Sequence, residues 1–284
     1  MSRRHSPTVR RRRLSAVLRQ LRRDHGSTLE TVTADLEWSR GRLAHMEGNK
    51  WTRPDVGNIR QLLDHYGVEG GEREAILSLA RQAREKGWWT RFKDVFGSDP
   101  LVGFESEASM ISTYQPIVVP GLLQTEGYAA AIARATPTEP AVGVDRRVEA
   151  RMARNEVLIG EGAPTVRAVI DESALHRIPV EGGVAEGQIR HLIEQAEDAD
   201  ADVTVQVLPF SAGLHPGIAG SFVVLDFPDA LDAPVVYLEP RTDGLFLEGP
   251  QEVAAYRSVF DGLQELALSQ AESVRRMKSI HDGL

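Results

Sequence analysis

The first 90 residues carry apolar side chains at the spacing of amphipathic helices. Leu14, Val17, Leu18 and Leu21 follow the i, i+3, i+4, i+7 pattern of one helix face, which predicts a helix from Arg12 to near Gly26. The same spacing predicts four more helices, over about residues 28–36, 39–47, 55–66 and 72–89. The pattern therefore predicts a compact all-α segment of five helices, of which the second and third are very short.

The pattern changes after residue 100, where short β-branched runs alternate with helical spacing. The runs are TVRAVID, VTVQVLPF, SFVVLDF and PVVYLEP, each bounded by turn residues. The earlier stretch EASMISTYQPIVVPGLLQTEGYAAAIARA combines a helical start, a proline-bounded apolar part and another helix. Strands interleaved with helices indicate an α/β or α+β domain.

These patterns predict a multidomain chain with an all-α head and a mixed α/β (or α+β) C-terminal domain. The predicted parts are a basic N-terminal arm (1–13), a helical domain (14–70), a connecting helix (71–100) that includes Trp88 and Trp89, and a C-terminal domain (101–284).

The net charge of −8 conceals an asymmetry along the chain. Residues 1–70 carry 14 Lys+Arg against 8 Asp+Glu, a net charge of +6, whereas the rest of the chain has a net charge of −14. A basic head on an acidic body suggests a module that binds a polyanion, attached to a domain with another role. A solubilising basic tail is the alternative.

Composition excludes several other classes of protein and of binding site. The chain has no cysteine, which excludes disulfides and thiolate metal sites. The basic N-terminus is not followed by an apolar region of the kind found in signal peptides, and no apolar run approaches 18 residues, so we expect a soluble, cytoplasmic protein. We also expect no metal, no cofactor and no contact with membranes.

The two helices between Thr28 and Glu47 are separated by a very short turn, as in a helix-turn-helix motif. In that motif the second helix, here predicted over about 39–47, lies in the major groove with its N-terminal residues against base edges. Those positions hold Ser39, Arg40 and Arg42, with His45 one turn further on. An arginine fork can bind O6 and N7 of guanine. Alternatively, both arginines are ordinary solvated residues of an amphipathic helix.

Other residues of the head have the chemistry of phosphate contacts. Thr28 and Ser39 stand at predicted helix starts, where hydroxyls and free N–H groups suit phosphate oxygens. Further cations would add sequence-independent affinity through counterion release; they are Lys50, Arg53, Arg10, Arg11, Arg12 and Arg13. The partner that these residues predict is double-stranded DNA.

Residues 14–70 resemble the lambda-repressor-like (Xre) helix-turn-helix family. The resemblance rests on the long first helix, the Gly-x-Thr entry to the second, Trp-Ser before the recognition helix and Glu-Gly at its end. Four later stretches resemble the long C-terminal domain of a large actinobacterial regulator group: EKGWW, TYQPIVVPGLLQTEGYA, VTVQVLPFSAGLHPGIAGSF and VVYLEPRTDGLFLEGPQEVAAYRSVFDGL. The resemblance implies a DNA-binding, antitoxin-like regulator with a small partner protein encoded nearby.

Several positions depart from the pattern of that family. Glycine normally occupies the turn position of Glu37, so Glu37 is expected in a left-handed conformation that costs about 1 kcal/mol. Ser27 stands where an apolar residue is usual, and Thr31 replaces the glutamate of a capping box. Gly41 is expected to lower the helix propensity of the recognition helix, and His45 replaces a common arginine.

A hydrolase-like enzyme is a competing hypothesis for the C-terminal domain. AVIDESALHR supplies Asp171, Glu172 and His176, and His191 and His215 follow. Adjacent carboxylates point apart in a strand or a helix, and the sequence contains no HExxH, GxSxG, P-loop or GxGxxG motif. We therefore expect no catalytic residues in this chain, unless a polar cleft brings Asp171, Glu172 and His215 together.

A role in sensing or protein interaction fits the C-terminal domain better. QPIVVPGLL, at residues 115–123, is apolar and bounded by prolines, as expected for a pocket, an interface or simply the core. Helix-turn-helix proteins generally pair to match two half-sites about 34 Å apart, so we expect a homodimer. The sequence-based hypothesis is a sequence-specific transcriptional regulator. The main alternative is a protein-interaction module whose head no longer binds DNA.

Overall fold

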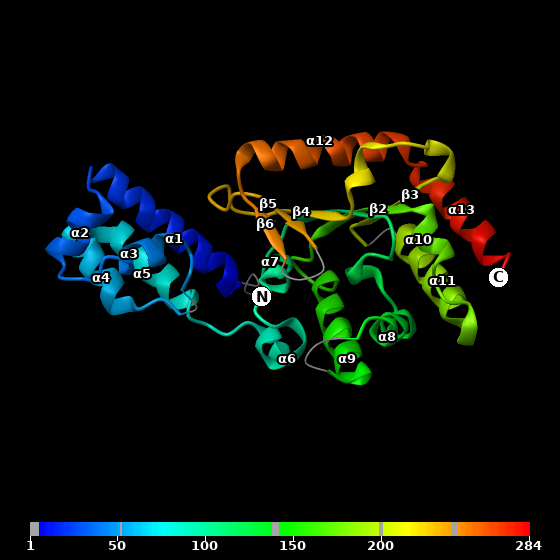
Figure 1. Ribbon diagram of the computed structural model, residues 1–284, viewed down its shortest axis with the longest axis horizontal. Coiled ribbons are helices and arrows are strands. Elements are labelled where there is room, and N and C mark those ends of the chain that lie inside the picture. The colour runs from blue at the N-terminus through cyan, green and yellow to red at the C-terminus, as the bar shows by residue number, and fades with distance from the viewer. Residues whose placement is uncertain (1–5, 52, 138–141, 199–200, 240–243) are drawn as a thin grey trace. The chain divides into compact units, whose positions relative to one another are not determined.

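The computed structural model describes residues 6–51, 53–137, 142–198, 201–239 and 244–284. The chain forms two compact units, residues 2–90 and residues 91–284. In the described residues the first unit is helical, and the second contains a mixed sheet with helices (Figure 1). The predicted fold class, an all-α head followed by a mixed α/β domain, is confirmed. None of the described helices is both long enough and apolar enough to span a membrane.

The first unit contains the five predicted helices. They are α1 (Pro7–Asp24), α2 (Leu29–Asp35), α3 (Arg42–Glu47), α4 (Val56–His65) and α5 (Gly70–Gln82). The side chains predicted from helical spacing form one core, whose fully buried members are Leu14, Leu18, Val32, Leu43, Ile59, Leu62, Leu63, Ala80 and Ala83. This packing stabilises α2 and α3, because helices of six or seven residues do not persist alone in water.

The predicted N-terminal arm is wrong for residues 7–13, which belong to α1. Pro7 stands in the first turn, where its missing N–H costs nothing, and the arginines that follow are good helix formers. One turn of this helix therefore holds four arginines, Arg10, Arg11, Arg12 and Arg13. Their side chains extend in different directions from the helix axis, instead of forming a flexible cluster. Residues 1–5 of the predicted arm lie outside the described residues.

The predicted connecting helix over 71–100 is also wrong, because α5 ends at Gln82. Trp88 and Trp89 belong to a separate 3-10 helix (Trp88–Phe92), which α6 (Lys93–Phe96) follows. A Cβ on Gly87 would approach the Trp89 ring to 2.3 Å. Glycine at this position therefore lets the chain turn back against the indole, which interrupts the helix that spacing alone predicts.

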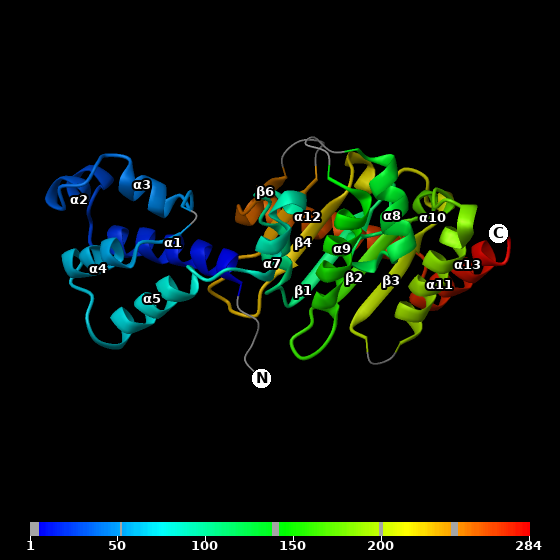
Figure 2. The ribbon, with the colours of Figure 1, turned by 90° about the horizontal axis from the view of Figure 1, so that it is seen from below.

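The second unit is built on a six-stranded sheet, as far as the structure describes the chain. Its strands are β1 (Met110–Gln115), β2 (Thr165–Asp171), β3 (Val203–Leu208), β4 (Phe222–Asp226), β5 (Val235–Leu238) and β6 (Leu245–Leu247). Their order is β3-β2-β1-β4-β5-β6 (Figure 2). β2 pairs in parallel with both β1 and β3, and Ile111 of β1 lies opposite Val166 of β2. The pairs β1–β4, β4–β5 and β5–β6 are antiparallel, and Ile111 lies opposite Leu225 of β4.

The sequence predicts that the stretch beginning EASMISTYQ starts as a helix, and this prediction is wrong, because Met110–Gln115 form the central strand β1. Ile111, Thr113 and Tyr114 have high strand propensity, and the strand is buried along its middle. A strand buried on both faces lacks the alternation that identifies a strand exposed on one face, so the run MISTYQ carries little periodic signal.

Helices cover both faces of the sheet. Figure 1 shows α12 (Pro250–Leu266) along one face, where Phe260 and Leu263 pack against Tyr114 and Phe222, and α8 (Glu126–Ala135) and α9 (Val144–Asn155) on the other. α11 (Val184–Glu197) and α13 (Gln270–His281) pack near β3. The shorter elements are α7 (Leu101–Glu105), α10 (Glu172–His176) and the 3-10 helices Gly121–Leu123, Glu156–Leu158, Glu181–Gly183, Phe210–Ala212 and Pro216–Ala219.

Candidate functional site

The first helix of the candidate DNA-binding motif, α2, begins at a hydroxyl cap. The Thr28 Oγ1 accepts a hydrogen bond from the Thr31 N–H at 3.1 Å and lies 3.0 Å from the Thr31 Oγ1. Thr31 thus takes part in the cap even though it cannot close a capping box as glutamate would. Thr28 is exposed at the N-terminal end of α2, the kind of position that suits a phosphate oxygen.

The turn after α2 is held by a left-handed residue, as the sequence predicts. Glu37 has φ of 54°, the Trp38 N–H donates to the Thr33 carbonyl at 2.8 Å, and the Glu37 N–H donates to the Ala34 carbonyl at 3.1 Å. This is the hydrogen-bond pattern of a Schellman motif, whose left-handed position is usually glycine. Glutamate there costs about 1 kcal/mol, and the surrounding core keeps the turn in place.

The second helix of the motif starts later than predicted. α3 begins at Arg42, and Ser39 is not its cap; Ser39, Arg40 and Gly41 form a turn in which the Arg42 N–H donates to the Ser39 carbonyl at 3.0 Å. Gly41 occupies the N-cap position, where glycine is well tolerated, so the predicted loss of helix propensity inside the recognition helix does not apply. The short helix ends at Gly48 and Asn49, as predicted.

The predicted base-reading residues share an exposed face. Ser39, Arg40, Arg42 and His45 are exposed, whereas Leu43 and Met46 of the same segment are buried. Within the described part of the chain, the side chains of Arg40 and His45 make no hydrogen bond or ion pair. Their donors are therefore available to a partner molecule.

Arg42 is oriented by the ring of Trp38, a residue that the sequence indicates only through the family resemblance, with no sign of this contact. Its guanidinium lies over the Trp38 ring, 5.3 Å from the centroid, and the Trp38 Nε1–H donates to the Gln61 Oε1 at 3.2 Å. Stacking on an aromatic face limits the rotamers of an arginine while leaving its outer N–H groups accessible. Trp38 thereby links the recognition segment to α4.

The other end of α3 is anchored to α1 through Glu47, which is only 4% exposed. The Arg22 Nε and Nη2 donate to the two Glu47 carboxylate oxygens at 2.8 and 2.9 Å, and this pairing raises the pKa of Arg22. The Arg19 guanidinium donates to the Glu47 carbonyl, and the Ser15 hydroxyl donates to the Met46 carbonyl at 2.7 Å. Three side chains of α1 thus satisfy the C-terminal end of the recognition segment.

The remaining predicted contacts lie in two places. Lys50 and Arg53 are exposed on the chain that follows α3, and the Lys50 N–H donates to the His45 carbonyl at 3.1 Å. Arg10, Arg11, Arg12 and Arg13 lie in the first half of α1. The structure thus brings Lys50 next to the end of the recognition segment.

Comparison with known protein families agrees with this division of the chain. A model described as a helix-turn-helix domain matches residues 13–76, and a model described as a domain of unknown function (DUF5753) matches residues 99–279 of the 284. The chain belongs to the DUF5753 family. No curated protein and no solved structure matched. The helix-turn-helix match covers all of α2, α3 and α4, and the DUF5753 match covers the whole sheet.

In the DUF5753 domain, the residues of the enzyme hypothesis have structural partners. Glu172, 1% exposed, accepts from the Phe210 N–H at 3.0 Å and from the Arg276 Nε at 2.8 Å, which ties α10 to α13. Asp171 caps α10 by accepting from the Ser173 N–H at 2.9 Å, and its other oxygen lies 4.0 Å from the His215 Nε2. His176 lies 3.5 Å from Glu172, and burial lowers the pKa of His191.

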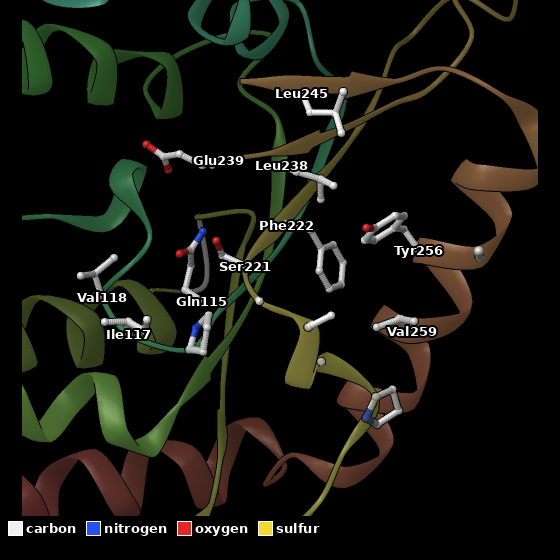
Figure 3. A pocket seen from close by; sticks show the side chains of 16 residues that line it. Gln115, Ile117, Val118, Ser221, Phe222, Leu238, Glu239, Leu245, Tyr256 and Val259 are labelled. Atoms are coloured by element: carbon white, nitrogen blue, oxygen red, sulfur yellow. The ribbon is translucent and has the colours of Figure 1, made fainter. Parts of the chain in front are cut away.

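The proline-bounded stretch 115–123 is divided between the core and a cavity. Val119 and Leu123 are fully buried, whereas Ile117 is 61% exposed and lines, with Val118, a cavity of about 730 Å³. Figure 3 shows Phe222, Tyr256 and Val259 on the opposite wall. We call this the apolar cavity. Its walls come from β1, β4, β5 and α12 of the DUF5753 domain.

We expect Glu37→Gly to raise the free energy of unfolding of the helical unit by about 1 kcal/mol, since glycine adopts the left-handed conformation without steric strain. Chemical denaturation of the full chain measures this. Asn49→Gly is the matched control, because Asn49 is also left-handed (φ of 52°) but asparagine tolerates that region. Equal gains from both substitutions, or a loss from Glu37→Gly, would contradict the assignment of strain to Glu37.

A second prediction concerns the acid sensitivity of the DUF5753 domain. Burial alone would raise the pKa of Glu172, but the Phe210 N–H and Arg276 outweigh it and hold the pKa below its ordinary value. Because the folded-state pKa is depressed, the stabilisation is present above the ordinary glutamate pKa of about 4.3 and is lost as pH falls through the folded-state value. We expect Glu172→Gln to cost about 2 kcal/mol at pH 7.

The stability difference between wild type and Glu172→Gln should then shrink as pH is lowered from 5 towards 3, as measured by urea unfolding at each pH. Glu186→Gln is the control, because the exposed Glu186–Arg190 pair contributes little. A difference that stays constant across this range would show that the ionised carboxylate is not what stabilises the domain.

Proposed function

We propose that this protein is a sequence-specific DNA-binding transcriptional regulator whose segment 39–47 reads the major groove. The observation that carries the proposal is the exposed pair Arg40 and Arg42 at the start of the second helix of a helix-turn-helix domain. That end of the helix is the part that approaches base edges when such a domain docks on DNA. A bidentate arginine–guanine contact gives about 1–3 kcal/mol of discrimination.

Phosphate contacts would come from the residues around this segment. The hydroxyls of Thr28 and Ser39 are exposed near the starts of the two helices, and Lys50 and Arg53 follow on the same connection. His45 lies one turn beyond Arg42 and is exposed beside it. Arg10 and Arg12 are buried and Arg11 and Arg13 are half-buried, all four on a helix, so they would contribute fewer phosphate contacts than an exposed arm.

We assign the DUF5753 domain to dimerisation and to sensing of a partner or ligand, with no catalysis. Its acidic character disfavours contact with DNA, and Glu172 is held in an ion pair that ties α10 to α13. The resemblance described above supports an Xre-type, antitoxin-like regulator that acts in the cytoplasm as a homodimer with a small partner protein. The apolar cavity, with exposed Ile117 on its wall, supports the sensing role.

The proposal is tested by fluorescence anisotropy of the full chain with a duplex from its own upstream region, across a salt series. We expect the wild type to prefer this duplex to a scrambled one, with affinity falling with salt at a slope of about −0.9 per phosphate contact. Arg40→Ala/Arg42→Ala should lose most of the preference, by tenfold or more, because the base contacts disappear while phosphate contacts remain.

Arg60→Ala/Arg81→Ala is the control, since both arginines lie outside the recognition segment, on α4 and α5. Equal, weak binding of every sequence by wild type and both variants would refute the proposal. The protein would then be an interaction module with a basic head.

A further inference from the structure

A second cavity of the DUF5753 domain, of about 790 Å³, differs from the apolar cavity in its charge. Its walls come from α9, the 3-10 helix Gly121–Leu123 and strands β1, β4 and β5. Three arginines of α9, Arg147, Arg151 and Arg154, line it at the i, i+4, i+7 spacing of one helix face. We call it the arginine cavity.

Two of the three arginines are already bound within the protein. The Arg154 Nε and Nη2 donate to the Glu105 carboxylate at 2.6 and 2.7 Å, and Glu105 is only 3% exposed. The Arg147 Nη1 donates to the carbonyls of Ala133 and Thr136, each at 2.7 Å, at the C-terminal end of α8. These two side chains line the cavity, but their donors are already bound to protein groups.

The Arg151 guanidinium differs from both, because it makes no hydrogen bond or ion pair with the described residues, although the carboxylates of Glu239 and Glu105 attract it from further away. Its Nη1 fills the space that a side chain at position 121 would need, at 2.4 Å from the Cβ position of Gly121. Burial, followed by repulsion from Arg154, lowers the pKa of Arg151 to about 10, so its guanidinium is still charged at pH 7. Arg151 is half-buried on the cavity wall, so a bound anion would find guanidinium donors that no described protein group accepts.

The arginine cavity adjoins the apolar cavity. Gln115, Val118, Ser221, Phe222 and Glu239 line both, so the cationic wall and the apolar walls meet along these residues. Figure 3 shows Gln115 and Ser221 between Val118 on one side and Phe222 on the other. A molecule that crosses this shared rim would find a guanidinium at one end and apolar side chains at the other.

We propose that the DUF5753 domain binds an organic carboxylate, whose carboxylate pairs with Arg151 and whose apolar part lies against Phe222, Tyr256 and Val259. A ligand with a single negative charge fits best, because one arginine is available and Glu239 in the same cavity would repel a dianion such as phosphate more strongly than a monoanion. The proposal names the ligand class for the sensing role proposed above. Binding itself does not depend on whether the head binds DNA.

The test is isothermal titration of the full chain, without DNA, with acetate, hexanoate, octanoate, 1-octanol and inorganic phosphate as probes. We expect octanoate to bind, and hexanoate to bind roughly tenfold more weakly because it buries two fewer methylenes. Acetate, which lacks an apolar part, phosphate and 1-octanol should bind at least tenfold more weakly than octanoate. Because no DNA is present, failure here is distinguishable from failure of the proposed regulator function.

Substitutions then test whether the carboxylate of octanoate binds at Arg151. Arg151→Met should weaken octanoate at least tenfold, and Arg151→Lys, which keeps the charge but not the fork, should weaken it less. Gly121→Ala should weaken it as well, because the added methyl displaces the guanidinium. Arg177→Met is the control, an exposed arginine outside both cavities, and should bind octanoate like the wild type.

Circular dichroism melts establish that each variant is folded before its binding is compared. Three results would overturn the proposal: no octanoate binding by the wild type, equal affinity in wild type and Arg151→Met, or binding of phosphate in preference to octanoate. Equal affinity for octanoate and 1-octanol would likewise show that apolar contact alone, without the guanidinium, accounts for binding.

Discussion

The ion pair between half-buried Arg22 and buried Glu47 anchors the end of the recognition segment to α1. α3 has six residues, too few to hold its shape without tertiary contacts. Leu43 and Met46 fix its inner face in the core, Trp38 fixes its start, and the side chains of Ser15, Arg19 and Arg22 bind its last carbonyls and carboxylate. The exposed arginines at the start of the segment are thus presented by a rigid support.

The sequence predicts most of this head because helical spacing is a local property. The five helices and core positions such as Leu14 and Leu18 follow from it. The left-handed Glu37 follows instead from the family resemblance, in which glycine normally occupies that turn position. What it does not predict are boundaries that depend on single residues. With Pro7 in its first turn, α1 begins before the residue at which the apolar pattern predicts its start. With Gly41 as its N-cap, α3 begins later than the predicted position. The Trp38–Arg42 stacking joins polar groups for which periodicity gives no signal.

The DUF5753 domain is less predictable, because its organisation depends on contacts between residues far apart in the chain. β1 is central and covered on both faces, so its sequence lacks the alternation of an exposed strand. The arginines of α9 look from sequence like the polar side of an amphipathic helix. Only the fold shows that Arg154 pairs with Glu105, 49 positions away in the sequence. It also shows that the Arg151 guanidinium forms no ion pair with a carboxylate of the described residues, although Glu239 and Glu105 lie near enough to attract it.

A double-mutant cycle on Arg22 and Glu47 tests most directly whether this pair holds the recognition segment. Unfolding of the helical unit is followed in the full chain by tryptophan fluorescence, because all four tryptophans lie in that unit. Arg22→Met and Glu47→Met should each cost about 3 kcal/mol, since each leaves one charge without its partner. The double variant should cost less than the sum by at least 1 kcal/mol. Additive losses would show that the two side chains do not stabilise each other, so that the position of the recognition segment does not depend on this pair.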